Sequence, residues 1–558
     1  MENGRIVFAL QEERLSKVKN QGGMPEHVFD YLESGVGIKI SEADAVVFTS
    51  HYTPISPKGR ESRIRSYKRK GAAIKIKQLL KKMGAKRARA TWLAKKRKKR
   101  LLMKGVNPAK IETMDHHFCH AASAYYGWGK FDEAILVLTN DGAGDGLCAT
   151  VSIGRDRRLE RIASVHMSHS LGELWALFTA MMGMVPLEHE YKLMGLAPYA
   201  PQMGVKRVKQ VFENYFSFAK DGLTWRVKQG RPAVPLAYNY FRDKMEFMRF
   251  DWIAGGLQAF TERFLCHWVK SSIAKTGVHK VALAGGTFMN VKANQKISEI
   301  EGVEDLFIFP SCGDETLPFG AAYYVYNRDA GISNKPLGHL YLGSEYSNDE
   351  IRTAYEHYPF EQKYVIKRSA NIVVDVVDLL VGGHIVAWFQ GREEFGARAL
   401  GARSIVADPT RGNVINEINE MIKSRDFWMP FASSILEEGV KRYLVNPKGI
   451  QSPYMVITFE TTKRAAEIAA GRHPFDLSCR PQIVNKGWHP KYYGLLKAFE
   501  QKTNRLGILN TSFNLHGLPI VSSPEDAFSV LEKSGLQYLA IGDWLIKKIG
   551  CSQKGSNG

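Results

Sequence analysis

The sequence predicts an α/β protein with more than one domain. The chain has 558 residues, which is too many for a single hydrophobic core. Short apolar runs that are typical of buried strands alternate with helical patterns over residues 111–330 and again over residues 365–548. Between them, residues 328–350 are rich in Gly, Ser, Asn and Pro. The expected organisation is a first domain over residues 1–330, a linker over residues 331–360 and a second domain over residues 361–558.

Several strands can be placed from their apolar pattern and from the turn residues that follow them. In the first domain they are residues 4–10, 43–49, 134–139, 280–284 and 306–309. In the second domain a strand over residues 385–389 comes early, and a helix from Pro524 and a strand from Tyr538 come last. The alternation of strands with helices predicts sheets that are covered by helices.

The positive charge of the chain is concentrated in one segment. The net charge is +21, from 77 Lys and Arg against 56 Asp and Glu. Residues 58–104 hold 21 of these bases and a single acid, Glu61, so the rest of the chain is almost neutral. Ile76, Leu79 and Met83 recur there at helical spacing, which predicts a basic helical hairpin inserted into the first domain. Such a segment suits a polyanion (nucleic acid or an anionic glycan) or an acidic membrane surface, and a solvated helical surface is the plain alternative.

Composition excludes several protein classes. No apolar run is long enough to span a membrane, and residues 1–8 do not have the pattern of a secretory signal. Six cysteines are scattered without a CxxC pair, which argues against zinc fingers and disulfide frameworks. We therefore expect a cytoplasmic protein.

Residues 391–409 form the most informative stretch of the second domain. They follow the strand over residues 385–389 and combine three glycines with Arg392, Arg398 and Arg403. Glycine allows a backbone to approach a ligand closely, and the planar guanidinium group of arginine binds phosphate or carboxylate through two hydrogen bonds. Because open α/β sheets bind ligands beyond the carboxyl ends of their strands, this loop is expected to bind an anion.

Two histidines and two aspartates of the first domain form a candidate metal site. His116 and His120 are four residues apart in a helix-forming run, so on a helix they share one face. Asp141 and Asp314 each follow a predicted strand, and such positions meet at one edge of a sheet. The four side chains would give a nitrogen and oxygen site suited to iron, manganese or zinc. On spacing alone, hydrogen-bonded histidines and turn aspartates are an equal alternative.

A diglycine follows another strand of the first domain. Gly285 and Gly286 come directly after the strand over residues 280–284, and Asn290 lies four residues further on. The backbone N–H groups of such a loop can bind the phosphates or ribose of a nucleotide. Diglycine turns are frequent, so this signal is weak by itself.

Longer motifs run through almost the whole chain in order. They are residues 11–17 (QEERLSK), 115–124 (DHHFCHAASA), 169–172, 190–198, 284–290 (AGGTFMN), 391–409, 422–432, 509–514 (LNTSFN) and 517–521. With these motifs the chain resembles the NodU/CmcH-type O-carbamoyltransferases, which carbamoylate hydroxyl groups of sugars and antibiotics. The resemblance implies an actin-like ATPase domain, similar to TsaD-type threonylcarbamoyl transferases, followed by a YrdC-like domain.

The resemblance also implies ligands and residues for two coupled reactions. ATP with Mg and carbamoyl phosphate would give a carbamoyl-adenylate in the second domain, and a hydroxyl-bearing small molecule or glycan would accept the carbamoyl group in the first. The implied metal ligands are His116, His120, Asp141 and Asp314, with iron first and then manganese or zinc. The implied catalytic residues are Arg398, Lys423, Arg425, Asn510 and Ser512. The implied cofactor-binding residues are Gly285, Gly286, Asn290, Lys423, Arg425 and Asn514. A homodimer is a further expectation.

Two departures from the family pattern leave alternatives open. Met429 stands where the family usually has an arginine of the carbamoyl-phosphate pocket. The chain also begins inside a hairpin that the family precedes with another strand and a loop containing His and Asp. A carbamoyl-type modification of a nucleic acid or nucleotide, prompted by the basic segment, and a decayed binding protein without activity are therefore the alternative hypotheses.

Overall fold

The computed structural model describes residues 1–52, 85–423 and 425–549. Contacts divide the chain into one compact unit of Met1–Val7 and Asn20–Leu337 and a second of Phe8–Lys19 and Gly338–Gly558. The expected borders lay at residues 330 and 361, whereas the chain passes from the first unit to the second after Leu337. In addition, the segment Phe8–Lys19, which the sequence analysis placed in the first domain, belongs to the second unit.

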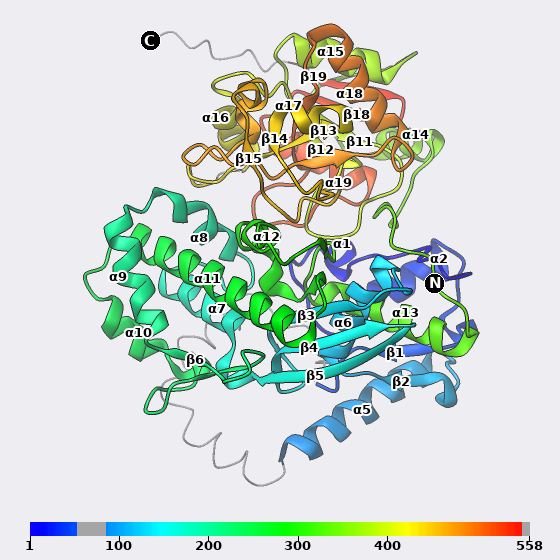
Figure 1. Cartoon of the computed structure of the whole chain (residues 1–558). Coiled ribbons are helices and arrows are strands. Elements are labelled where there is room, and N and C mark those ends of the chain that lie inside the picture. The colour runs from blue at the N-terminus through cyan, green and yellow to red at the C-terminus, as the bar shows by residue number, and fades with distance from the viewer. Residues whose placement is uncertain (53–84, 424, 550–558) are drawn as a thin grey trace. The chain divides into compact units, whose positions relative to one another are not determined.

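The first unit is built around a five-stranded sheet with the order β5-β4-β3-β8-β9. Its strands β3, β4 and β5 lie side by side in Figure 1. The strands are β3 (Ile135–Gly144), β4 (Leu147–Arg155), β5 (Arg158–His166), β8 (Lys280–Ala284) and β9 (Asp305–Ile308). β3, β4 and β5 are antiparallel, while β8 and β9 run parallel to β3. A meander followed by parallel crossover strands is the order of an actin-like ATPase sheet, and the predicted α/β fold class is confirmed.

Helices cover this sheet. The helix α6 (His116–Trp128) lies against β3, β4 and β8, and α13 (Leu317–Ala330) packs on α6. The 27-residue helix α11 (Phe250–Thr276) packs against α8 (Glu190–Leu196), α9 (Gln202–Glu213) and α12 (Val291–Ser298). The remaining elements of the unit are α2 (Glu26–Ser34), α5 (Ala85–Met103), α7 (Leu171–Met181), α10 (Tyr238–Met245), the parallel pair β1 (Val46–Phe48) and β2 (Ile111–Thr113), and the antiparallel pair β6 (Phe216–Phe218) and β7 (Trp225–Val227).

Two predictions near the N-terminus are only partly matched. The strand expected over residues 4–10 is absent from the described structure, which has a single bridge between Glu2 and Arg5 there. Within the expected basic hairpin over residues 58–104, residues 58–84 lie outside the described residues. The rest of the hairpin contains α5. Among the described residues, no helix has both the length and the apolar character needed to cross a bilayer.

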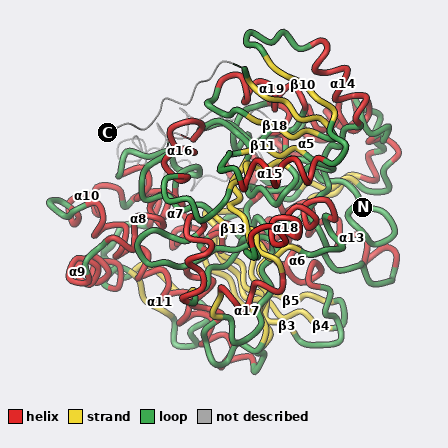
Figure 2. Tube along the Cα trace, turned by 90° about the horizontal axis from the view of Figure 1, so that it is seen from above, coloured by secondary structure: helices red, strands yellow, loops and turns green. Residues whose placement is uncertain are grey.

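The second unit contains a mixed sheet with the order β10-β19-β18-β11-β12-β17-β13-β16. Its strands are β10 (Tyr364–Arg368), β11 (Val386–Phe389), β12 (Arg403–Ala407), β13 (Ala432–Leu436), β16 (Gln482–Val484), β17 (Gly507–Ser512), β18 (Tyr538–Ile541) and β19 (Trp544–Lys548). α15 (Ile372–Val381) and α18 (Pro490–Thr503) pack on each other and contact β11, β13 and β17 (Figure 2). The other elements are α1 (Glu12–Ser16), α14 (Asn348–His357), α16 (Val414–Ile418), α17 (Val440–Tyr443), α19 (Pro524–Lys533), and the pair β14 (Leu444–Val445) and β15 (Glu460–Thr461).

A buried ion pair attaches the segment Phe8–Lys19 to the second unit. The Arg14 Nε atom lies 3.3 Å from Glu393 Oε1, and both side chains are 1% exposed. The hydroxyl groups of Ser344 and Ser522 donate hydrogen bonds to Glu393, at 2.9 and 2.6 Å. A buried charge is tolerated only when it is paired and hydrogen-bonded, so these contacts explain why the segment leaves the unit of its sequence neighbours.

Replacing Glu393 with Gln should therefore destabilise the second unit. The change leaves the Arg14 guanidinium buried without its counter-charge, so we expect the free energy of unfolding to fall by about 3 kcal/mol. Calorimetry or urea denaturation measures the loss. Glu437→Gln removes an exposed carboxylate of the same unit and serves as the control. Equal stability of the two variants would contradict the importance of the pair.

Candidate functional sites in the two units

In the first unit, the helix α6 positions two histidines. Asp115 begins the helix by accepting a hydrogen bond from the Phe118 backbone N–H at 2.8 Å, and Gly129 ends it in the left-handed conformation. His116 and His120 occupy one face of the helix, as their spacing predicted, and their ring centroids are 4.8 Å apart. Both side chains are buried.

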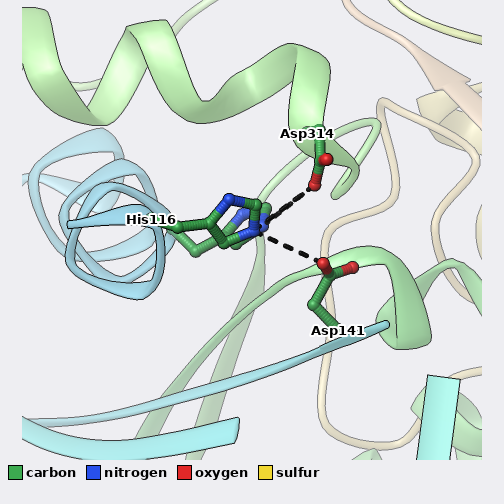
Figure 3. Close-up of side chains that lie close together, drawn as sticks. His116, Asp141 and Asp314 are labelled. Carbon is green, nitrogen blue, oxygen red and sulfur yellow. Dashed lines mark ion pairs between the residues drawn. The ribbon is translucent and has the colours of Figure 1, made fainter. Parts of the chain in front are cut away.

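Two aspartates complete the cluster from the ends of parallel strands. Asp141 follows the paired part of β3, and Asp314 follows β9 (Figure 3). The His116 Nε2 atom lies 3.4 Å from Asp141 Oδ2 and 3.5 Å from Asp314 Oδ1. His120 Nε2 lies 3.7 Å from the same Asp314 oxygen. The structure thus brings together all four residues that the sequence singled out, with their ligand atoms within 4.8 Å of one another.

The geometry of this cluster fits a metal ion better than a set of direct hydrogen bonds. Distances of 3.4 to 3.7 Å are long for hydrogen bonds, and within residues 1–52, 85–423 and 425–549 neither the His116 Nε2 nor the His120 Nε2 atom has a hydrogen-bond partner although both are buried. Two ligand atoms that share one metal at ~2.1 Å are roughly 3.0–3.5 Å apart. A group of two imidazoles and two carboxylates can therefore hold a divalent metal.

The surroundings shift the pKa values of His116 and His117 in opposite directions. Burial lowers the pKa of His116, but the nearby carboxylates, above all Asp314 and Asp141, raise it to about 9. Burial and the two adjacent imidazoles lower the pKa of His117 to about 3, and its Nδ1 atom lies 2.9 Å from Thr139 Oγ1. Burial acts to raise the pKa of Asp141, yet the contact with His116 prevails and holds that pKa far below its usual range.

The diglycine shapes this site from the adjacent strand. Gly285 has φ +101°, and a Cβ atom on it would lie 2.4 Å from the Asn140 backbone oxygen. The Gly286 N–H donates to Asp141 Oδ1 at 2.9 Å. Asn290 caps α12 through the Ala293 N–H. In the described structure Gly285 and Gly286 pack against Asn140 and Asp141 at the end of β3, and Asn290 starts α12.

A chain of hydrogen bonds connects the basic helix α5 with the metal-site helix. Arg97 of α5 is fully buried and donates to the carbonyl oxygens of Ser50 and His51 at 2.8 and 3.1 Å. The same two residues donate to Asp145, through the Ser50 hydroxyl and the His51 N–H. Asp145 also accepts the His116 N–H at 3.0 Å. The sequence offered no signal for this connection, because it depends on how α5 packs.

In the second unit, a buried lysine joins two predicted motifs. Lys423 ends the π-helical turn η8 (Asn419–Lys423) and is 1% exposed. Its ammonium group donates to Asn514 Oδ1 at 2.7 Å, to the Asn514 carbonyl oxygen at 3.0 Å and to Ser512 Oγ at 3.2 Å. Burial, followed by the cations Arg425 and Lys19, holds the pKa of Lys423 well below its usual range. The KxR and SxN elements therefore meet at this lysine.

Asn510 lies in β17 beside them. Its side-chain amide donates to Ser434 Oγ at 2.9 Å and to the Ala399 carbonyl oxygen at 3.2 Å. Its Oδ1 atom is buried and has no hydrogen-bond partner within the described structure. A buried acceptor without a donor is costly unless a ligand supplies one.

The structure adds an arginine that sequence reasoning missed. Arg480 lies two residues before β16, and its Nε atom is buried without a hydrogen-bond partner among the described residues. Burial, then Arg398, then Arg425, hold the pKa of Arg480 well below its usual range. Three guanidinium groups that repel one another are stabilised by an anion. Arg480 carried no signal in the sequence beyond its place before a short apolar run.

Besides Arg398, residues 391–409 contain Arg392 and Arg403, and both contact backbone carbonyl oxygens. Arg392 donates to the Leu342 carbonyl oxygen at 2.8 Å. Arg403 is fully buried, lies 3.6 Å above the Phe389 ring and donates to backbone carbonyl oxygens, including that of Gly391 at 3.0 Å. Both side chains hold the loop, and of the three arginines Arg398 is the one with a marked electrostatic effect on Arg480. Anion binding by the loop stays a prediction, and Arg392 and Arg403 have a structural role that the sequence did not predict.

Comparison with known proteins identifies the family to which the chain belongs. Residues 1–323 match the family model described as carbamoyltransferase N-terminus, and residues 377–548 match that described as carbamoyltransferase C-terminus. An uncharacterized protein of Synechocystis sp. is 30% identical over 99% of this chain and 95% of its own. Nodulation protein NolNO of Sinorhizobium fredii is 28% identical over 98% of this chain and 78% of its own. The 3'-hydroxymethylcephem-O-carbamoyltransferase of Amycolatopsis lactamdurans is 26% identical over 47% of each chain.

The family models together span most of the chain and include every residue of both sites. The protein belongs to the carbamoyltransferase family and is an enzyme.

Proposed function

We propose that the protein is an ATP-dependent O-carbamoyltransferase that forms carbamoyl-adenylate in its second unit and transfers the carbamoyl group to a hydroxyl group in its first. One observation carries the proposal: Lys423 joins Ser512 and Asn514 next to a cluster of arginines. The relative from Amycolatopsis, an O-carbamoyltransferase by name, supports a hydroxyl acceptor. The acceptor is a small molecule or glycan, and the reduced cysteines of the described chain fit the cytoplasm.

The activation reaction joins two anions. Water cleaves carbamoyl phosphate to carbamate and phosphate, and a carbamate oxygen then attacks the α-phosphorus of ATP. The bond from that phosphorus to the bridging oxygen breaks, so pyrophosphate leaves and carbamoyl-adenylate remains. Because carbamate and Mg-bound ATP repel each other, the reaction requires fixed positive charge at the place where they meet.

The residues of the second unit supply this charge. Arg398, Arg425 and Arg480 offer guanidinium groups that fit phosphate oxygens, and Lys423 adds a desolvated ammonium group. The unpartnered Asn510 Oδ1 atom can accept a hydrogen bond from the carbamoyl NH₂ group. Met429 leaves the pocket without the arginine that the family usually has there. Arg480 and Arg425 are the cations that remain to hold the phosphate.

Transfer takes place in the first unit. The acceptor oxygen forms a bond to the carbamoyl carbon, the bond from that carbon to the adenylate oxygen breaks, and AMP leaves while the hydroxyl proton is lost to solvent. A divalent metal held by His116, His120, Asp141 and Asp314 would supply positive charge at the carbonyl and phosphate oxygens. Iron, manganese and zinc all suit these donors. Gly286 contacts Asp141, and the nucleotide would bind along this turn, between Gly285 and Asn290.

Lys423→Met should abolish activation. The variant removes a buried cation that holds the two motifs together, so we expect carbamoyl-phosphate-dependent release of pyrophosphate from ATP to fall at least ~100-fold. Lys441→Met, on an exposed lysine of α17, is the matched control. Retained pyrophosphate release in the Lys423 variant would exclude this assignment of the second unit.

Arg480→Met should weaken binding of carbamoyl phosphate. Loss of one charge-assisted contact is expected to raise the KM for carbamoyl phosphate ~10-fold or more, and Arg480→Lys should restore part of the affinity. Steady-state kinetics measures both. Arg464→Met, on an arginine with 68% of its side chain exposed, should leave KM unchanged. An unchanged KM in Arg480→Met would exclude contact between Arg480 and the phosphate.

His120→Ala should separate the two reactions. The variant removes a buried imidazole of the candidate metal site. We expect the protein to lose both its bound metal and carbamoyl transfer, while pyrophosphate release in the second unit continues. Metal analysis and product detection by mass spectrometry provide the readouts. His279→Ala, on an exposed histidine of the same unit, controls for the substitution. Full metal content in the His120 variant would refute the metal role.

A further inference from the structure

The basic helix α5 is anchored to the first unit along one face. Leu93, Arg97 and Leu101 recur every four residues, and all three are buried. Leu101 packs in a cluster with Met24, Ile40 and Val106, while Arg97 donates to two backbone carbonyl oxygens. These contacts fix the orientation of α5 on the first unit. The residues on the opposite face of the helix therefore point away from that unit.

The opposite face is strongly cationic. Lys95, Lys96, Lys98 and Lys99 are exposed, and none of them forms an ion pair with an acid in the part of the chain that the structure describes. Only the flanking cations are paired: Arg100 with Glu26 and Lys104 with Asp30. Four adjacent like charges without counter-ions repel one another, and an anionic partner relieves the repulsion.

Apolar side chains share this cationic face. Trp92 is 52% exposed and Met103 is 78% exposed, and Leu102 is also exposed. Trp92, Lys96, Lys99 and Met103 follow one another at spacings of four, three and four residues, so they lie along one stripe of the helix. The Lys96 ammonium group lies 4.3 Å from the centre of the Trp92 ring.

We propose that this outward face of α5 docks on the surface of an anionic lipid bilayer. Lysine ammonium groups would contact the lipid phosphates, while Trp92, Leu102 and Met103 would enter the zone between headgroups and acyl chains, where tryptophan is favoured. The helix is about 28 Å long and would lie flat on the bilayer, since its other face is buried in protein.

The same observations favour lipid over nucleic acid. Among the side chains of α5 that the structure describes, the exposed cations without an acidic partner are all lysines, whereas recognition of phosphate and base edges in nucleic acids relies heavily on the planar fork of arginine. The arginines at positions 97 and 100 are turned to the protein or paired with Glu26. A single exposed aromatic ring is not a platform for stacking several bases, and Leu102 and Met103 have no role against a phosphate backbone.

Vesicle binding by the full chain tests the proposal without substrates, so its outcome is independent of the proposed catalytic function. We expect cosedimentation with phosphatidylcholine vesicles containing phosphatidylglycerol, little binding to pure phosphatidylcholine, and weaker binding at high salt. The double variant Lys95→Glu, Lys99→Glu should lower the partition coefficient ~10-fold or more. Trp92→Ser should lower it several-fold, roughly as loss of one interfacial aromatic would.

Matched variants on α9 control for charge and apolarity. Lys206→Glu with Arg207→Glu reverses two exposed charges of the same unit, and Met203→Ser removes an apolar side chain that is 71% exposed. These should bind vesicles like the parent chain, and all variants should keep its thermal midpoint. Equal effects of the α5 and α9 changes would overturn the proposal. So would tighter binding of a double-stranded oligonucleotide that depends on Lys95 and Lys99 but not on Trp92.

Discussion

Buried carboxylates in the second unit hold the loop on which its anion site depends. Glu393 pairs with Arg14, and Glu394 accepts the backbone N–H groups of Leu400, Ala402 and Arg403 through one oxygen atom. Burial lowers the pKa of Arg403, and the two carboxylates partly offset this effect. Arg398, in the same loop, acts on Arg480, and we propose that these two cations face the anionic ligand.

The two units have sites of opposite character. The first places two carboxylates and two imidazoles around one point, which attracts a cation. In the second, Arg425 and Lys19 act on the buried Lys423, and Arg398 and Arg425 act on the buried Arg480, and such a group of cations attracts anions. This division suits an enzyme that joins two anionic substrates in one place and uses a metal in another. Among the described residues, both sites retain buried polar atoms without a hydrogen-bond partner, which a bound ligand would satisfy.

The sequence predicted the site residues whose positions depend on a single helix or on the end of a single strand. The i,i+4 spacing placed His116 and His120 on one helix face, and the ends of parallel strands brought Asp141 and Asp314 to the same sheet edge. Arg480 could not be found in this way, because its approach to Arg398 depends on the pairing of distant strands. The structural role of Arg392 and Arg403 was not predicted for a related reason: a glycine-rich turn needs donors for nearby carbonyl oxygens, and the sequence does not distinguish those donors from ligand-binding ones.

The position of Phe8–Lys19 in the second unit has a consequence for the order of folding. During synthesis this segment leaves the ribosome long before its contacts exist, since Arg14 and the Gly396 carbonyl oxygen that it binds are 382 residues apart. Until then Arg14 stays hydrated, and the first unit can fold without the segment Phe8–Lys19. The entropic cost of closing so long a loop grows only slowly with its length. The large separation therefore delays the formation of the Arg14 contacts but adds little to their free-energy cost. The second unit is therefore completed after translation, when its earliest residues meet some of its latest.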